Sequence, residues 1–198
     1  MAKKKKKLSK KHHFESNKLL IILLLFLTFV LLIVYASAKS KPRSISEKEI
    51  VGAVNSSMVK VPDTSFVVSL TDGKAEFSDS ETQGNVSVSE PYYWVKTQDG
   101  YDVFSVMSYS TGGLEEFVNV ALFQETKGKI TYKGSFPIGD RVIVSGIEKE
   151  SEGDGEYMIK VNYLDRAEED LMSDAPSLEK STSFEVISHQ IVIPAPSQ

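Results

Sequence analysis

The chain has 198 residues and no cysteine, which excludes disulfides, thiolate chemistry and zinc sites with cysteine ligands. Its charge is unevenly placed: residues 1–38 carry eight lysines and one glutamate, whereas residues 39–198 carry 15 basic and 26 acidic residues, a net charge of −11. The acidic balance of this larger part argues against nucleic acid as a partner and allows a basic protein partner.

The first 38 residues indicate where the protein works. A lysine-rich head, residues 1–18, runs into an uncharged apolar segment at residues 19–38. At about 1.5 Å per residue, a helix of this length spans roughly 30 Å, the thickness of a bilayer's hydrocarbon core. Because basic residues stay on the cytoplasmic side of a first hydrophobic segment, we predict a single-pass cell-membrane protein with its N-terminus inside and its C-terminal domain extracytoplasmic. Ala36-Ser37-Ala38 also has the form of a signal-peptidase site, so secretion after cleavage at Ala38 is the alternative.

Residues 39–52 are interpreted as a linker between this segment and the main domain. Within it, Ser46 and Glu49 have the spacing of a capping box. The pair predicts a short helix at residues 46–54, with a loose linker as the alternative.

Strand patterns dominate residues 53–193, and residues 194–198 are predicted to be a tail. Turn signals separate the apolar runs at intervals of about 8–12 residues, a spacing typical of antiparallel sandwiches and barrels. The fold class is therefore mainly β: an antiparallel sandwich or barrel-like domain after one N-terminal transmembrane helix. Besides a hairpin around Asp99-Gly100, the predicted strands are residues 66–71, 74–78, 116–124, 130–136, 141–147, 157–164 and 184–193.

The first predicted hairpin turns at Asp72-Gly73, a dipeptide that suits a two-residue primed turn. This turn predicts that Leu70 faces Ala75 and that Val68 faces Phe77. All four apolar side chains then lie on one face, so pattern and turn agree.

The second predicted hairpin turns at Asp99-Gly100, with Val95 facing Phe104 and Tyr93 facing Val106. Both faces of this pair are apolar, which predicts a central position in the sheet. The opposite face carries Tyr92, Trp94, Val103 and Met107.

Short motifs in the second half of the chain occur in a characteristic order. Ile138-Gly139-Asp140-Arg141-Val142 is followed by Val161-Asn162-Tyr163-Leu164-Asp165-Arg166, then by Pro176 and Thr182-Ser183-Phe184. Together they resemble an uncharacterised family of small exported or membrane-anchored bacterial β domains, and the resemblance covers about two-thirds of the chain. Val54-Asn55 and Leu70-Thr71-Asp72-Gly73-Lys74 match the family's asparagine-aromatic strand and first hairpin.

The resemblance implies an envelope protein and no established chemistry. It marks six family-motif residues, for which we expect a structural role: Asp140, Arg141, Tyr163, Asp165, Arg166 and Pro176. The family usually carries an acidic, calcium-like stretch before its central strand. Here residues 97–102 hold only Asp99 and Asp102, whereas calcium takes six to eight oxygen ligands. We therefore expect a plain hairpin turn there, and neither a metal nor a cofactor.

The remaining candidates for chemistry are few. His189 is the one histidine after residue 38, and we expect it in the last strand as a surface or edge residue rather than a catalytic one. Ser110-Thr111-Gly112-Gly113 lacks the lysine and the strand-to-helix setting of a P-loop, so it is interpreted as a turn rather than a phosphate cradle. Asp140, Asp165 and Glu168 could serve a glycosidase if they lined a cleft, but arginines follow the two aspartates and favour ion pairs that fix loops.

Two features are candidates for recognition. Tyr92, Trp94 and Tyr101 could stack on sugars or anchor a protein interface, although a β domain of this size also needs such residues in its core. The acidic runs at residues 148–156 and 168–174 are typical of solvated loops and could steer a basic partner.

We therefore expect a membrane-anchored extracytoplasmic domain of the bacterial cell envelope that binds a protein or an envelope component, such as a glycan, without catalysis. The alternatives are a glycan or peptidoglycan hydrolase that uses aspartate and glutamate carboxylates, and a structural subunit of a membrane complex. Raised carboxyl pKa values in a cleft would favour the hydrolase. A large exposed apolar patch would favour the subunit.

Overall fold

The computed structural model describes residues 24–31, 45–152, 156–167, 170 and 175–193, in two units, Met1–Arg43 and Ser44–Gln198. In the first unit, residues 24–31 form a helix whose leucine and phenylalanine side chains are exposed. The rest of the predicted span at residues 19–38 lies outside the described residues. Among the helices that are described, none is both long and apolar enough to cross a membrane.

The second unit is mainly β and antiparallel, as predicted. Its elements follow the chain in the order α2 (Glu47–Val54), β1 (Met58–Lys60), β2 (Val67–Ser69), β3 (Lys74–Ser78), β4 (Gln83–Lys96), β5 (Gly100–Ser110), β6 (Phe117–Thr126), β7 (Lys129–Asp140), β8 (Ile143–Glu152), β9 (Glu156–Asp165), β10 (Leu178–Ile187) and β11 (Gln190–Val192). The strands predicted at residues 116–124, 130–136, 141–147 and 157–164 correspond to β6 to β9.

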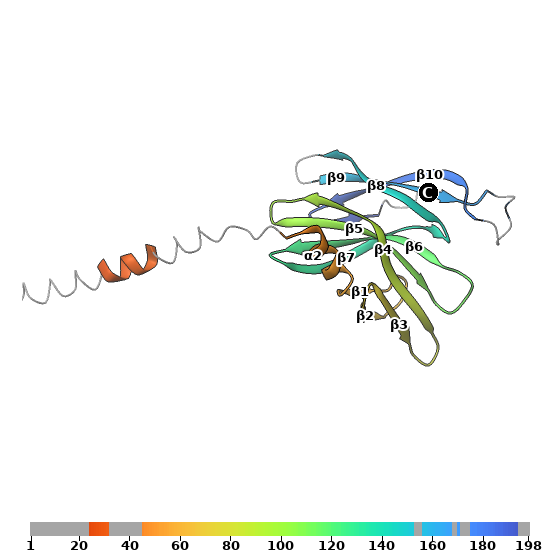
Figure 1. Cartoon of the computed structure of the whole chain (residues 1–198), viewed down its shortest axis with the longest axis horizontal. Coiled ribbons are helices and arrows are strands. Elements are labelled where there is room, and N and C mark those ends of the chain that lie inside the picture. The colour runs from red at the N-terminus through yellow and green to blue at the C-terminus, as the bar shows by residue number, and fades with distance from the viewer. Residues whose placement is uncertain (1–23, 32–44, 153–155, 168–169, 171–174, 194–198) are drawn as a thin grey trace, which may run out of the picture. The chain divides into compact units, whose positions relative to one another are not determined.

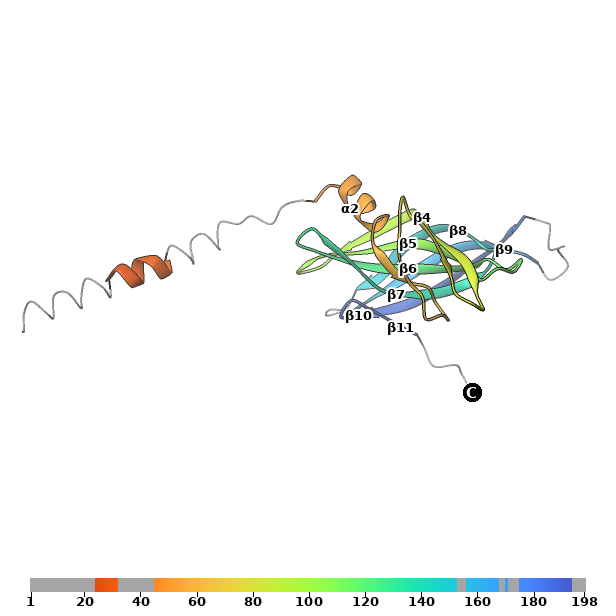
Figure 2. The same cartoon turned by 90° about the horizontal axis from the view of Figure 1, so that it is seen from below.

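Two large sheets pack face to face, and a small third layer covers one of them (Figure 1). The larger sheet has the order β3-β4-β5-β6-β7, the second has β11-β10-β9-β8, and β1 pairs with β2 in a short ribbon. The strands of the two large sheets run in nearly the same direction in Figure 2. Of the two predicted architectures, the sandwich is confirmed, and the sheets do not close into a barrel.

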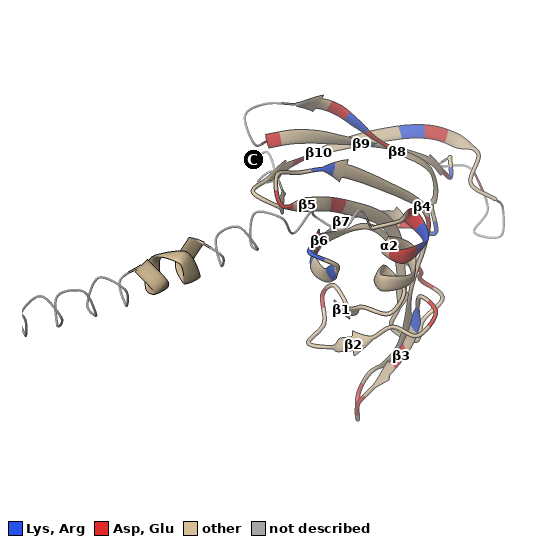
Figure 3. Ribbon diagram, turned by 60° about the vertical axis from the view of Figure 1, so that its left-hand side comes forward, with Lys and Arg blue, Asp and Glu red and all other residues tan. Residues whose placement is uncertain are grey.

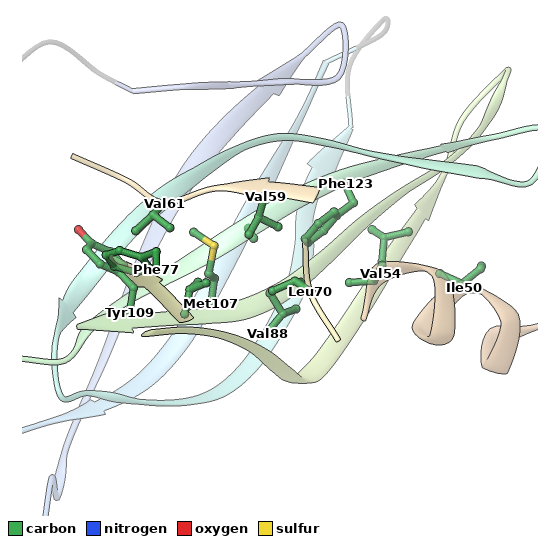
Figure 4. Close-up of a cluster of buried hydrophobic side chains, with 13 residues drawn as sticks. Ile50, Val54, Val59, Val61, Leu70, Phe77, Val88, Met107, Tyr109 and Phe123 are labelled. Atoms are coloured by element: carbon green, nitrogen blue, oxygen red, sulfur yellow. The ribbon is translucent and has the colours of Figure 1, made fainter. Parts of the chain in front are cut away.

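The five-stranded sheet lies between the other two and is called the central sheet below. It has a hydrophobic core on each face because its middle strands are apolar on both sides. Between the two large sheets, Phe104, Leu122 and Val120 of the five-stranded sheet pack against Ile159 and Phe184 of the other. On the opposite face, side chains from α2, β1 and β3 pack on β4, β5 and β6 (Figure 4). The prediction that the pair β4 and β5 is central in its sheet is confirmed.

Helix α2 forms through the predicted capping box. The Ser46 side chain accepts a hydrogen bond from the N–H of Glu49, and the Glu49 side chain accepts one from the N–H of Ser46 at 2.9 Å. These contacts satisfy two N–H groups at the helix start that have no partner within the helix. Ile50 and Val54 are 3% and 0% exposed. The helix therefore belongs to the folded unit, which begins before residue 53, the predicted domain start.

The predicted turn at Asp72-Gly73 is present, but its strand pairing is wrong. Asp72 and Gly73 have φ values of +50° and +77°, and Thr71 bridges to Lys74. Beyond this bridge the strands separate, because β2 pairs with β1 and β3 pairs with β4. Leu70 and Phe77 nevertheless enter the same core, so the predicted apolar face is right although the predicted partners are not.

The second hairpin is displaced from its predicted register by two residues. Val95 pairs with Asp102 and Tyr93 with Phe104, and the N–H of Thr97 donates to the carbonyl of Gly100 at 3.0 Å. Gly100 is not a turn residue here: a Cβ on it would lie 2.0 Å from the carbonyl oxygen of Glu125 in β6. A shift of two residues preserves which side chains share a face, so the predicted faces are correct.

The last predicted strand, residues 184–193, is two strands. Ser188 and His189, with φ values of +50° and +63°, form the turn between β10 and β11. The sequence has no glycine or asparagine at this turn, so the usual signal for a hairpin is missing. His189 thus lies in a turn and not in a strand, contrary to the prediction.

Candidate functional site

The first family motif forms the corner where the chain passes from β7 to β8. Asp140 accepts hydrogen bonds from Nε of Arg141 at 3.0 Å and from the backbone N–H of Glu116 at 2.9 Å. A Cβ on Gly139 would lie 2.8 Å from Cγ1 of Val142, so a larger residue there would require the Val142 side chain to move. Hydrogen bonds from the Arg141 guanidinium are the main reason that the pKa of Asp140 is held below its ordinary value. The motif therefore fixes the crossover between the sheets.

The second motif stands at the same end of the sandwich. Asp165 accepts a hydrogen bond from Nζ of Lys180 at 2.8 Å, which is the main cause of its lowered pKa. The positive charge of Arg166 lowers the pKa values of both Asp140 and Asp165, so the two motifs share one electrostatic neighbourhood. Tyr163 packs against the small core cluster of Val106, Val118 and Val142. Pro176 precedes Ser177, whose N–H donates to the carbonyl of Asp165 at 2.9 Å.

This arrangement bears on the hydrolase alternative. A catalytic general acid needs a carboxyl pKa raised towards neutral pH, whereas both Asp140 and Asp165 have lowered values. Their partners are Arg141 and Lys180, which stabilise the ionised carboxylates. The third candidate, Glu168, lies outside the described residues. Asp140 pairs with the arginine that follows it, whereas the ion pair of Asp165 is with Lys180 on the neighbouring strand β10.

The three aromatic candidates lie half-buried on the α2 side of the central sheet. Tyr92, Trp94 and Tyr101 all pack against the core cluster that contains Val54 and Phe123. Burial raises the pKa of Tyr92, whose hydroxyl donates to Oδ1 of Asn55 at 2.8 Å. These side chains therefore serve the core and leave only part of their surface to solvent.

Two further motifs meet at Asn55. The N–H of Gly73 donates to the backbone carbonyl of Asn55 at 2.9 Å, and the Asn55 side chain accepts the hydrogen bond from Tyr92. A Cβ on Gly73 would lie 2.7 Å from the carbonyl oxygen of Val88, so this position needs glycine for its close approach and for its positive φ. Asn55 joins the end of α2, the first turn and β4.

A buried carboxylate links the two large sheets at the opposite end. Asp102 of β5 is 0% exposed and accepts a hydrogen bond from the hydroxyl of Tyr157 in β9 at 2.6 Å. Its oxygens also lie 2.8 and 3.0 Å from Nδ1 of His189 in the β10–β11 turn. Burial, followed by the contact with Asp102, raises the pKa of Tyr157, which keeps its hydroxyl protonated as a donor. The cluster ties the C-terminal hairpin to the central sheet.

Two adjoining hollows lie on the outer part of the five-stranded sheet, with volumes of about 480 and 530 Å³. Both are lined by Glu76 and Asn85. The first is completed by Phe77, Ser78, Gln83, Gly84, Ser110, Gly112 and Gly113, and the second by Lys74, Ala75, Val86 and Ser87. The glycines of the predicted turn at residues 110–113 thus line a surface depression. In the described part of the chain, no group of three or more histidine and acidic side chains is placed to hold a metal ion.

Comparisons with family models, with curated proteins and with solved structures found no match to this chain.

Sequence reasoning missed both the Asp102 cluster and the hollows. Asp102 was treated as a turn residue, although its place in the alternation with Phe104 and Val106 puts a charge on the inward face of a strand. This position of a charged residue in the alternation was the sequence signal that could have indicated the cluster. No sequence signal indicates the hollows, because β3, β4 and residues 110–113 meet only through strand pairing in the fold.

Proposed function

We propose that this protein is a membrane-anchored, extracytoplasmic binding domain of the cell envelope, without catalytic activity of its own. The observation that carries the proposal is the division of charge between the two units. Residues 1–43 hold 11 basic residues and one acidic residue, a net charge of +10, around the apolar segment at residues 19–38. The folded unit from residue 44 holds 12 basic and 26 acidic residues, a net charge of −14.

This division fits an anchor that inserts with its basic end in the cytoplasm, because retained lysines set the orientation of a first apolar segment. Residues 1–18 are then the cytoplasmic tail and residues 19–38 the span. Cleavage after Ala38, which would release the domain, is the alternative outcome at this segment.

The negative charge of the folded unit supports binding of a basic protein as one function. Acidic residues occur on strands of both large sheets and in their loops (Figure 3). A domain with a net charge of −14 attracts cationic partners over distances comparable to the Debye length, about 10 Å at 0.1 M salt. Such attraction raises the association rate and weakens as salt increases.

Two observations favour binding over the hydrolase alternative. The pKa values of Asp140 and Asp165 are lowered rather than raised, and both carboxylates are paired with cationic side chains.

The test is affinity capture with the full chain in detergent as bait, against a solubilised envelope extract, at about 0.1 M and about 1 M salt. The proposal predicts saturable retention of an envelope component, which mass spectrometry or sugar analysis identifies, and retention of any protein ligand that falls at high salt. Turnover of peptidoglycan by the purified chain, lost in Asp140→Asn or Asp165→Asn, would instead establish the hydrolase.

A further inference from the structure

We draw no further inference here: the strongest candidate, the side-chain cluster of Asp102, Tyr157 and His189 where β5 and β9 meet the β10–β11 turn, belongs to the link between the two large sheets already described, and nothing in the described part of the chain shows what its partly exposed imidazole would bind or act on.

Discussion

Replacing Asp102 tests the buried link between the two sheets. Asp102 is 0% exposed and accepts hydrogen bonds from Tyr157 at 2.6 Å and from His189 at 2.8 Å. In Asp102→Ala, both donors lose their acceptor. A hydrogen bond to a charged group contributes about 1.5–3 kcal/mol. The His189 side chain is 27% exposed and can hydrogen-bond to water in the variant. The free energy lost with the His189 contact is therefore at the low end of this range.

The expected cost of Asp102→Ala is therefore about 3 kcal/mol, with the Tyr157 contact as the larger part. Removing a buried charge recovers some desolvation energy, which keeps the sum below the full value of two such bonds. Asp102→Asn should cost about 2 kcal/mol, because a neutral amide oxygen is a weaker acceptor. The assay is urea unfolding of the full chain in a mild detergent, followed by tryptophan fluorescence.

The matched control is Asp99→Ala, which removes an exposed turn carboxylate three residues earlier and should change stability by no more than about 0.5 kcal/mol. In a double-mutant cycle, Asp102→Asn and Tyr157→Phe should show a coupling of about 1 kcal/mol or more. A cost below about 0.5 kcal/mol for Asp102→Ala, or additive effects in the cycle, would refute the view that this cluster holds the sheets together.

Three further predictions concern single positions. Gly73→Ala should destabilise the fold by about 1–3 kcal/mol, since the residue has positive φ and its Cβ would meet the carbonyl of Val88; equal unfolding midpoints would contradict this. The pKa of Asp140 is lowered in the folded protein, so its ion pair stabilises the fold fully at pH values above the ordinary carboxyl pKa. This stabilisation is lost as the pH falls through the lowered pKa of the folded state. Asp140→Asn should therefore flatten the acid limb of a stability–pH curve below about pH 4. Burial raises the pKa of Tyr109 from 10.0 to about 12. The stability that the fold gains from the protonated Tyr109 hydroxyl is therefore fully present below pH 10.0 and is lost as the pH rises towards 12. Tyr109→Phe should remove that part of the alkaline loss, and an unchanged limb in urea unfolding would count against it.

The sequence predicted local features well because they depend on neighbouring residues. The capping box of Ser46 and Glu49 and the turn at Asp72-Gly73 both formed, since each needs only a few adjacent groups. The apolar faces around Phe104 were right despite a register shift of two residues, because such a shift keeps alternation intact.

Features that depend on distant residues could not be predicted in the same way. The partners of Asp102 lie 55 and 87 residues further along the chain, so nothing near Asp102 in the sequence announces them. The separation of β2 from β3 after their shared turn likewise depends on the competing strands β1 and β4. The candidate motif residues were found, but their pairing with Lys180 and Glu116 required the fold.

The central claim, an extracytoplasmic domain on a basic cytoplasmic anchor, is tested most directly by thiol labelling, because the chain has no cysteine of its own. Single variants Ser80→Cys, in an exposed position between β3 and β4, and Ser9→Cys, in the lysine-rich head, are treated with a membrane-impermeant maleimide in intact cells freed of any outer membrane. Our account predicts that the Ser80→Cys chain is labelled at once, and that the Ser9→Cys chain is labelled only after the membrane is permeabilised. Labelling of Ser80→Cys only after permeabilisation would place the folded unit inside the cell and contradict it.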